Sequence, residues 1–112
     1  MKEVKAFVRH FKSAGIHKAL KAAGYCCMTF SECEGTGQYT DPSEDFPSFK
    51  FPFMHSKVVK IEIVCQDADV EPIIRIIQEH GRAGRSGDGL IYTSGVEQVY
   101  KVRNEQKGAE AI

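Results

Sequence analysis

The sequence predicts an α+β fold whose elements follow the order β-α-β-β-α-β. Residues 3–9 and 58–66 alternate between apolar and polar side chains, as half-buried strands do. Apolar residues recur at helical spacing over residues 13–23 and 70–80, after each of these strands. Elements in this order form the ferredoxin-like arrangement, in which two helices cover one face of an antiparallel sheet.

The first strand and helix are predicted from residues 3–24. The strand places small and branched apolar side chains on its core face and Phe7 and Arg9 on the other face. Ser13 is the expected N-cap of the helix, and Gly24 is its expected C-terminal stop.

The second strand is expected over residues 25–34, which are rich in residues that suit a pleated surface. The third strand, over residues 58–66, has the clearest pattern. Its core face carries an apolar side chain at every second position: Val59, Ile61, Ile63 and Cys65.

The second helix can be capped by Asp67 or Asp69, and it tolerates Pro72 in its first turn. Residues 90–94 form the expected fourth strand, and residues 98–103 form a short final extended piece. The second face of the sheet carries Phe7, Thr29, Glu62 and Val64. We expect this partly apolar face to meet another subunit.

The composition of the chain narrows its possible classes. We expect its 112 residues to form one domain, spanning 1–112. The formal net charge is zero, so no overall field attracts the chain to nucleic acid. The apolar runs are too short to span a membrane, and the N-terminus does not resemble a signal peptide, so we expect a cytoplasmic protein whose four cysteines are free thiols.

A long flexible loop is predicted over residues 36–57, where a hairpin needs only about two to five residues. Its end carries an aromatic stripe: Phe49, Phe51 and Phe53. Two interpretations stay open at this stage. The stripe covers the protein's own core, or it binds a partner, since aromatic residues concentrate at binding surfaces.

Four stretches resemble the PII signalling proteins, trimeric regulators of nitrogen and carbon metabolism. They are "VRHFK", "GYCCMTFSECEGTGQ", "KIEIVCQDADVEPIIRII" and, most specifically, "GRSGDGLIYTSGVEQVYKVR". The tail over residues 104–112 also resembles the family's ending. The resemblance implies a homotrimer that binds ATP or ADP between subunits, performs no catalysis and regulates a membrane transporter or a metabolic enzyme through its long loop.

The resemblance also implies the nucleotide-binding residues. Glycine-rich turns suit phosphate, because backbone N–H groups can approach it closely. The residues implied are Thr29, Gly35, Gly37, Gln38, Glu62, Val64, Gly87, Asp88, Gly89, Lys101 and Arg103, the last two contributed by a neighbouring subunit. Phe49, Phe51 and Phe53 are the predicted partner-binding residues.

The chain departs from the family pattern at the site. Leu90 replaces a lysine and Lys101 replaces an arginine, which weakens contact with a triphosphate and favours ADP or AMP. Tyr39 and Val58 stand where the family holds Mg²⁺ and 2-oxoglutarate, which argues against both as ligands. Phe51 and Phe49 replace the tyrosine and the serine that relatives have modified.

Three alternative functions are each suggested by part of the sequence. A metal-binding protein is suggested by Cys26, Cys27, Cys33 and Cys65 with four histidines, although Cys27 and Cys33 are too far apart along a strand to chelate one ion together. An enzyme could recruit Arg9, His10, His17 and Arg85, but no recognisable motif places a nucleophile beside a base. A trimeric scaffold would not need Lys101 and Arg103.

Overall fold

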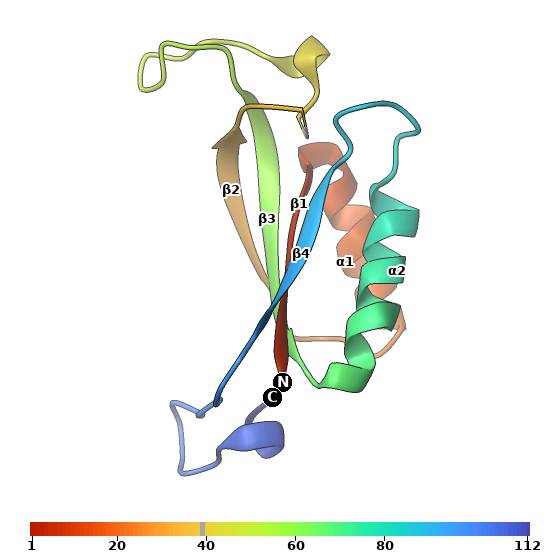
Figure 1. The fold of residues 1–112 in the computed structure, drawn as a ribbon, viewed down its shortest axis with the longest axis vertical. Coiled ribbons are helices and arrows are strands. Elements are labelled where there is room, and N and C mark those ends of the chain that lie inside the picture. The colour runs from red at the N-terminus through yellow and green to blue at the C-terminus, as the bar shows by residue number, and fades with distance from the viewer. Residues whose placement is uncertain (39) are drawn as a thin grey trace.

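The structure is a computed structural model that describes residues 1–38 and 40–112, so the prediction for Tyr39 lies outside the described residues. The strands and helices are β1 (Lys2–Arg9), α1 (Ser13–Ala22), β2 (Thr29–Gly35), β3 (Ser56–Cys65), α2 (Val70–Gly81) and β4 (Gly89–Gly95). The sheet is antiparallel with the strand order β2-β3-β1-β4, and both helices cover one of its faces (Figure 1). The predicted ferredoxin-like α+β fold is confirmed.

The core lies between the sheet and the two helices. Ala6 of β1 pairs with Ile61 of β3 on one side and Ile91 of β4 on the other. Their side chains meet the apolar stripes of α1 and α2, and the fully or almost fully buried members are Val4, Ala6, Ile16, Leu20, Ile61, Ile73 and Ile77. The alternating pattern of β1 and β3 therefore assigned the core faces correctly.

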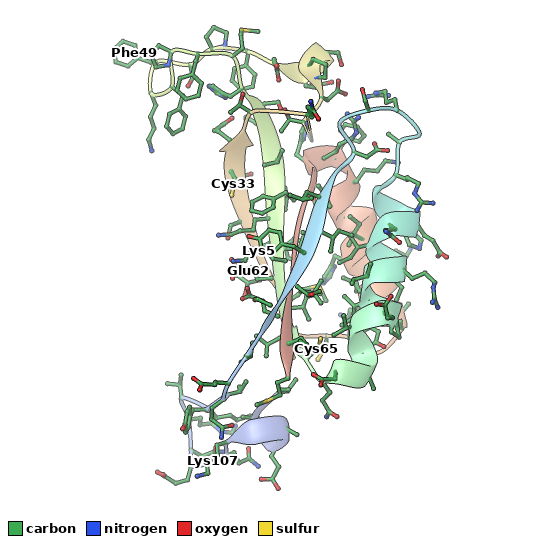
Figure 2. The ribbon with its side chains drawn as sticks, in the orientation of Figure 1. Lys5, Cys33, Phe49, Glu62, Cys65 and Lys107 are labelled. Carbon is green, nitrogen blue, oxygen red and sulfur yellow. The ribbon has the colours of Figure 1, made fainter. Side chains whose placement is uncertain are left out.

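No helix of the described residues covers the second face of the sheet, on which Lys5 and Glu62 project away from the helices (Figure 2). On this face Phe7 stacks on Tyr92 with 6.3 Å between ring centroids. The neighbouring Leu90 is 48% exposed. This mixture of rings and charges is the predicted partly apolar surface.

The second strand begins at Thr29, four residues later than predicted. The backbone N–H of Tyr25 donates to the carbonyl of Leu20 at 2.9 Å and so belongs to the end of α1. The chain needs residues 25–28 to cross the end of the sheet before it can pair with β3. Residues 56 and 57, predicted as loop, belong to β3 because Gly35 pairs with Ser56.

The predicted helix caps are wrong in detail. Ser13 is the first residue of α1, and its hydroxyl donates to the carbonyl of His10 at 2.8 Å, because a 3-10 turn over His10–Lys12 precedes the helix. At the start of α2, Asp69 makes no side-chain capping bond, and Asp67 forms an ion pair with the N-terminal amine. Gly24 ends α1 with a positive φ of 96°, as predicted.

The tail after β4 leaves the sheet. Tyr100 and Lys107 form an isolated β-bridge, and a short 3-10 turn follows over Gly108–Ala111. The tail and the loop that joins α2 to β4 lie at opposite ends of the subunit (Figure 1). In the described part of the chain, no helix has the length and apolar character that crossing a membrane requires.

Gly89 provides a test of the packing between β1 and β4. Its φ is +118°, and a Cβ atom added there would lie 2.0 Å from the carbonyl oxygen of Phe7. We expect Gly89→Ala to lower the free energy of unfolding by about 2–4 kcal/mol, because strain and a backbone clash act together. Denaturant unfolding at one fixed protein concentration measures the change.

Gly95→Ala is the matched control, since Gly95 ends the same strand and an added Cβ meets nothing within 4 Å. Equal unfolding midpoints for the two variants would contradict the close approach at Gly89.

Candidate functional site

Arg9 joins two loops at one end of the sheet. Its side chain was predicted to lie on the face opposite the core, but it is buried, with 4% of the residue exposed. The guanidinium donates from Nε to Oδ1 of Asp88 at 3.0 Å and from Nη2 to the carbonyl of Ser86 at 2.8 Å. A third bond runs from Nη1 to Oδ2 of Asp41. Arg9 is buried because two carboxylates neutralise it there.

Asp41 holds the first part of the long loop. Its Oδ1 accepts hydrogen bonds from the backbone N–H of Ser43 at 3.0 Å and from the Ser43 hydroxyl at 2.7 Å. Its Oδ2 also accepts from Nη2 of Arg85 at 3.1 Å. These donors, with Ser43 foremost and then Arg9 and Arg85, hold the pKa of Asp41 well below its usual range.

Asp88 shapes the loop between α2 and β4. Its Oδ1 accepts from the backbone N–H of Ala83 at 2.9 Å, and its Oδ2 accepts from that of Gly84 at 3.3 Å. Burial raises the pKa of Asp88, but the two backbone N–H groups and Arg9 together lower it by more than burial raises it. The pKa of Asp88 therefore lies below its ordinary value. The carboxylate of Asp88 therefore stabilises its own loop and orients Arg9.

Gly87 is the point at which the two loops touch. Its φ is +89°, and a Cβ atom added there would lie 2.6 Å from the carbonyl oxygen of Thr40. Thr40 in turn donates from its hydroxyl to the carbonyl of Gly37 at 3.0 Å. Gly87 is therefore required by packing between the loops, apart from any need for a ligand to approach it.

The predicted nucleotide residues fall into two groups within one subunit. Gly35, Gly37 and Gln38 lie at the base of the long loop, near the turn that contains Gly87, Asp88 and Gly89. Thr29 and Glu62 are direct cross-strand partners at the other end of β2. That end is about 20 Å from Gly35, at roughly 3.3 Å per residue along a strand.

Lys101 and Arg103 belong to the second group, because both are exposed residues of the tail, and the tail lies at that end of the chain (Figure 1). A cleft of about 410 Å³ lies beside the first group and is lined by residues of α2, of β4 and of the loop between them, including Arg82, Asp88 and Leu90. A single chain does not bring the predicted phosphate-binding cations, Lys101 and Arg103, to the glycine turn (Figure 1).

A second cluster, centred on the buried His55, holds the far end of the long loop. His55 is 1% exposed, and its Nδ1 lies 2.8 Å from Oε2 of Glu34 in β2. Its Nε2 lies 3.1 Å from the Ser48 hydroxyl and 3.2 Å from the carbonyl of Phe51. The structure thus places a hydroxyl, an imidazole and a carboxylate together, which no sequence motif had indicated.

This Ser48–His55–Glu34 cluster is tied to the backbone of the loop. The Ser48 hydroxyl accepts from the N–H of Phe51 at 3.0 Å, so the hydroxyl is held by its own turn. Phe46 and His55 also form an isolated antiparallel bridge. These contacts anchor the loop to β2.

The aromatic stripe divides in two. Phe51 is half-buried, and its ring packs against His55 with 5.6 Å between centroids. Phe49 is fully exposed at the tip of the loop (Figure 2), and Phe53 is 55% exposed. Phe51 therefore covers the protein's own His55 cluster, in line with the first interpretation, whereas Phe49 faces outward. Partner binding by these residues stays a prediction.

The pairing of Arg9 with Asp41 was not predicted from the sequence. The only local signal was the Asp41–Pro42 start of a turn, which the structure shows as a 3-10 turn capped by the Asp41 side chain. The cysteine content of the sequence also suggested a metal-binding protein. Over residues 1–38 and 40–112, no three His, Cys, Asp or Glu side chains gather as a metal site would need.

The Asp41 network makes stability depend on pH. A carboxylate whose pKa is lowered by folding stabilises the folded state fully above its ordinary pKa of about 3.9, and this contribution is lost as the pH falls below that value. We therefore expect Asp41→Asn to lower the melting temperature at pH 7, with a difference from wild type that decreases below about pH 4. Thermal melts from pH 7 to pH 3 measure it.

Glu79→Gln is the matched control, because Glu79 is exposed on α2 and lies on another element. A pH-independent loss of stability in Asp41→Asn would show that Asp41 acts without its charge.

Comparison with known proteins agrees with this geometry. Residues 1–106 match the model of the family described as "Nitrogen regulatory protein P-II". Over 112 residues the chain is 36% identical to a "Nitrogen regulatory protein P-II" of Microchaete diplosiphon and 34% identical to that of Azospirillum brasilense, with both chains covered completely. It is 34% identical to "Nitrogen regulatory protein P-II 2" of Methanothermobacter thermautotrophicus, covering 97% of that protein. The chain belongs to the P-II family of nitrogen regulatory proteins.

Proposed function

We propose that this P-II protein acts in nitrogen regulatory signalling by binding an adenine nucleotide and changing the position of its long loop. The observation that carries the proposal is the contact between Gly87 and Thr40, reinforced by the shared guanidinium of Arg9. A phosphate at the glycine turn would act on the same few residues that hold the base of the loop. A partner protein would then bind one position of the loop in preference to another.

The nucleotide site is proposed to lie between subunits of a homotrimer. The tail that carries Lys101 and Arg103 lies at the opposite end of the chain from the loop between α2 and β4, so a complete site would need the tail of a neighbour (Figure 1). The open sheet face offers a surface for that neighbour, since it combines the Phe7–Tyr92 ring pair with the exposed Leu90.

ADP or AMP is the proposed preferred ligand. Leu90 borders the cleft beside the glycine turn and offers no charge to a terminal phosphate. Lys101 contributes a point charge in place of the two-pronged hydrogen bonding of an arginine. Val58 is buried in β3, which supports the proposal that 2-oxoglutarate is not held by a cation there.

The proposed output is binding of a membrane transporter or a metabolic enzyme by the tip of the loop. Both ends of the loop are anchored, by Asp41 and by His55, so movement at either anchor reaches the tip. Phe49 and Phe53 present apolar rings to solvent, which suits a hydrophobic contact. The scheme contains no catalytic step.

Arg103 tests the nucleotide site. We expect Arg103→Ala to weaken ADP binding by about 10-fold to 100-fold, because it removes a charge-assisted hydrogen bond to phosphate. Calorimetric titration with ATP, ADP and AMP, each with and without Mg²⁺ and 2-oxoglutarate, measures the effect and the order of affinity.

The control is Arg75→Ala, since Arg75 is exposed on α2, away from the tail and the open sheet face. Sedimentation should show the same oligomer for both variants and wild type. Unchanged ADP affinity in Arg103→Ala would remove Arg103 from the site, and no nucleotide binding by wild type would refute the proposed function.

The exposed rings test the partner contact. We expect the double variant Phe49→Ser and Phe53→Ser to lose at least 10-fold in retention of the partner, while ADP affinity stays unchanged, because both rings lie outside the nucleotide residues. Adding Phe51→Ser should also lower thermal stability, because Phe51 packs on His55.

Phe11→Ser is the control, as Phe11 is 51% exposed outside the long loop. Retention of partners from cell extract on immobilised protein gives the comparison. Equal retention by the loop variant and by Phe11→Ser would contradict a role for the rings.

A further inference from the structure

Two adjacent thiols lie exposed between α1 and β2. Cys26 and Cys27 are both free and exposed, and their sulfur atoms are 3.0 Å apart. This hydrogen-bonded contact is the first cause of a raised pKa for Cys27. Nothing in the nucleotide scheme uses these side chains.

A pocket of about 490 Å³ opens beside the pair. Cys26 lines it together with His17, Met28 and Phe30, and the His17 and Phe30 rings meet edge to face with 5.8 Å between centroids. The pocket therefore places the sulfur-bearing Cys26 beside two aromatic rings, and Cys27 contacts Cys26 through its own sulfur.

The number of metal-binding side chains near the thiol pair decides which kind of ligand it can hold. Zinc in structural sites takes four protein ligands, and within the described ranges 1–38 and 40–112 no third His, Cys, Asp or Glu joins the two thiols. A monosubstituted trivalent arsenical needs only two thiols, because its third bond goes to carbon.

The separation of the sulfurs also favours a bridging atom over a direct bond. A disulfide needs about 2.05 Å between sulfurs, and between adjacent cysteines it closes a small ring around a planar peptide bond that resists twisting. An arsenic atom bonded between the sulfurs enlarges that ring, and the two sulfurs then need not come as close to each other as in a direct S–S bond.

We propose that Cys26 and Cys27 form a vicinal dithiol site for a monosubstituted trivalent arsenical, whose organic group lies in the adjoining pocket. Each sulfur forms one bond to arsenic, the two thiol protons leave with the arsenical oxygen as one water molecule, and no atom changes its oxidation state. An aryl arsenical is the expected class, because Phe30 and His17 provide ring contacts.

The site is also placed to act on the nucleotide, an extension that rests on the proposed function. Cys27 lies within the electrostatic influence of Lys101, which opposes the rise in its pKa. Thr29 follows two residues later at the start of β2. Occupation of the dithiol would move this segment and weaken nucleotide binding.

Phenylarsine oxide is the probe for the site. Reduced full-length protein should form one phenylarsenic adduct per chain by intact mass, which survives excess 2-mercaptoethanol and is removed by 2,3-dimercaptopropanol. Cys26→Ser and Cys27→Ser should each lose the resistant adduct, whereas Cys33→Ser should keep it, because Cys33 lies half-buried on β2. Thermal melts confirm that each variant is folded.

An adduct that 2-mercaptoethanol removes from wild type, or one that persists in a folded Cys26→Ser variant, would overturn the dithiol site. In the second arm, ADP affinity should fall at least 10-fold in the wild-type adduct and stay unchanged in arsenical-treated Cys26→Ser. Unchanged affinity in the adduct overturns the coupling alone. Absence of ADP binding in untreated wild type refutes the proposed function while the mass result still decides the dithiol.

Discussion

The arrangement of both loops depends on the ion pairs of the buried Arg9 guanidinium with one carboxylate from each loop. It lies at the end of β1 with 4% of the residue exposed and contacts Asp41 and Asp88. A charge removed from water in this way is tolerated only when opposite charges and hydrogen bonds replace the lost hydration. If either loop moved away from Arg9, the guanidinium would lose one of the two carboxylates that compensate for its lost hydration.

This dependence gives the molecule a mechanical connection between its two candidate regions. The glycine turn cannot carry a Cβ at Gly87 because the backbone of Thr40 occupies that space. At its other end the loop is tied to β2 through His55 and Glu34. Between the two anchors the tip displays Phe49 to solvent. A movement of the glycine turn would therefore shift Thr40 and, through the chain that follows it, the exposed aromatic rings of the loop.

Much of the fold was predictable because its pattern is local. The alternation in β1 and β3 and the helical stripes of α1 and α2 assigned the elements and the core faces. The start of β2 was missed because Tyr25 bonds back to Leu20, a helix-end contact that strand propensity cannot reveal. Ser13 was expected to cap α1, but the preceding turn placed it inside the helix. For the candidate site, the glycine turn was recognisable, whereas the partners of its residues were not.

The sequence by itself determined the order of elements, the faces that form the core and the position of the glycine-rich turn, since each follows from residues that are close together in the chain. Only the tertiary structure decided where the polar side chains act. Arg9 meets Asp88 across 79 positions and Asp41 across 32, and Glu34 meets His55 across 21. No periodicity records such pairings, because they depend on which strand ends and loops the sheet brings to the same edge.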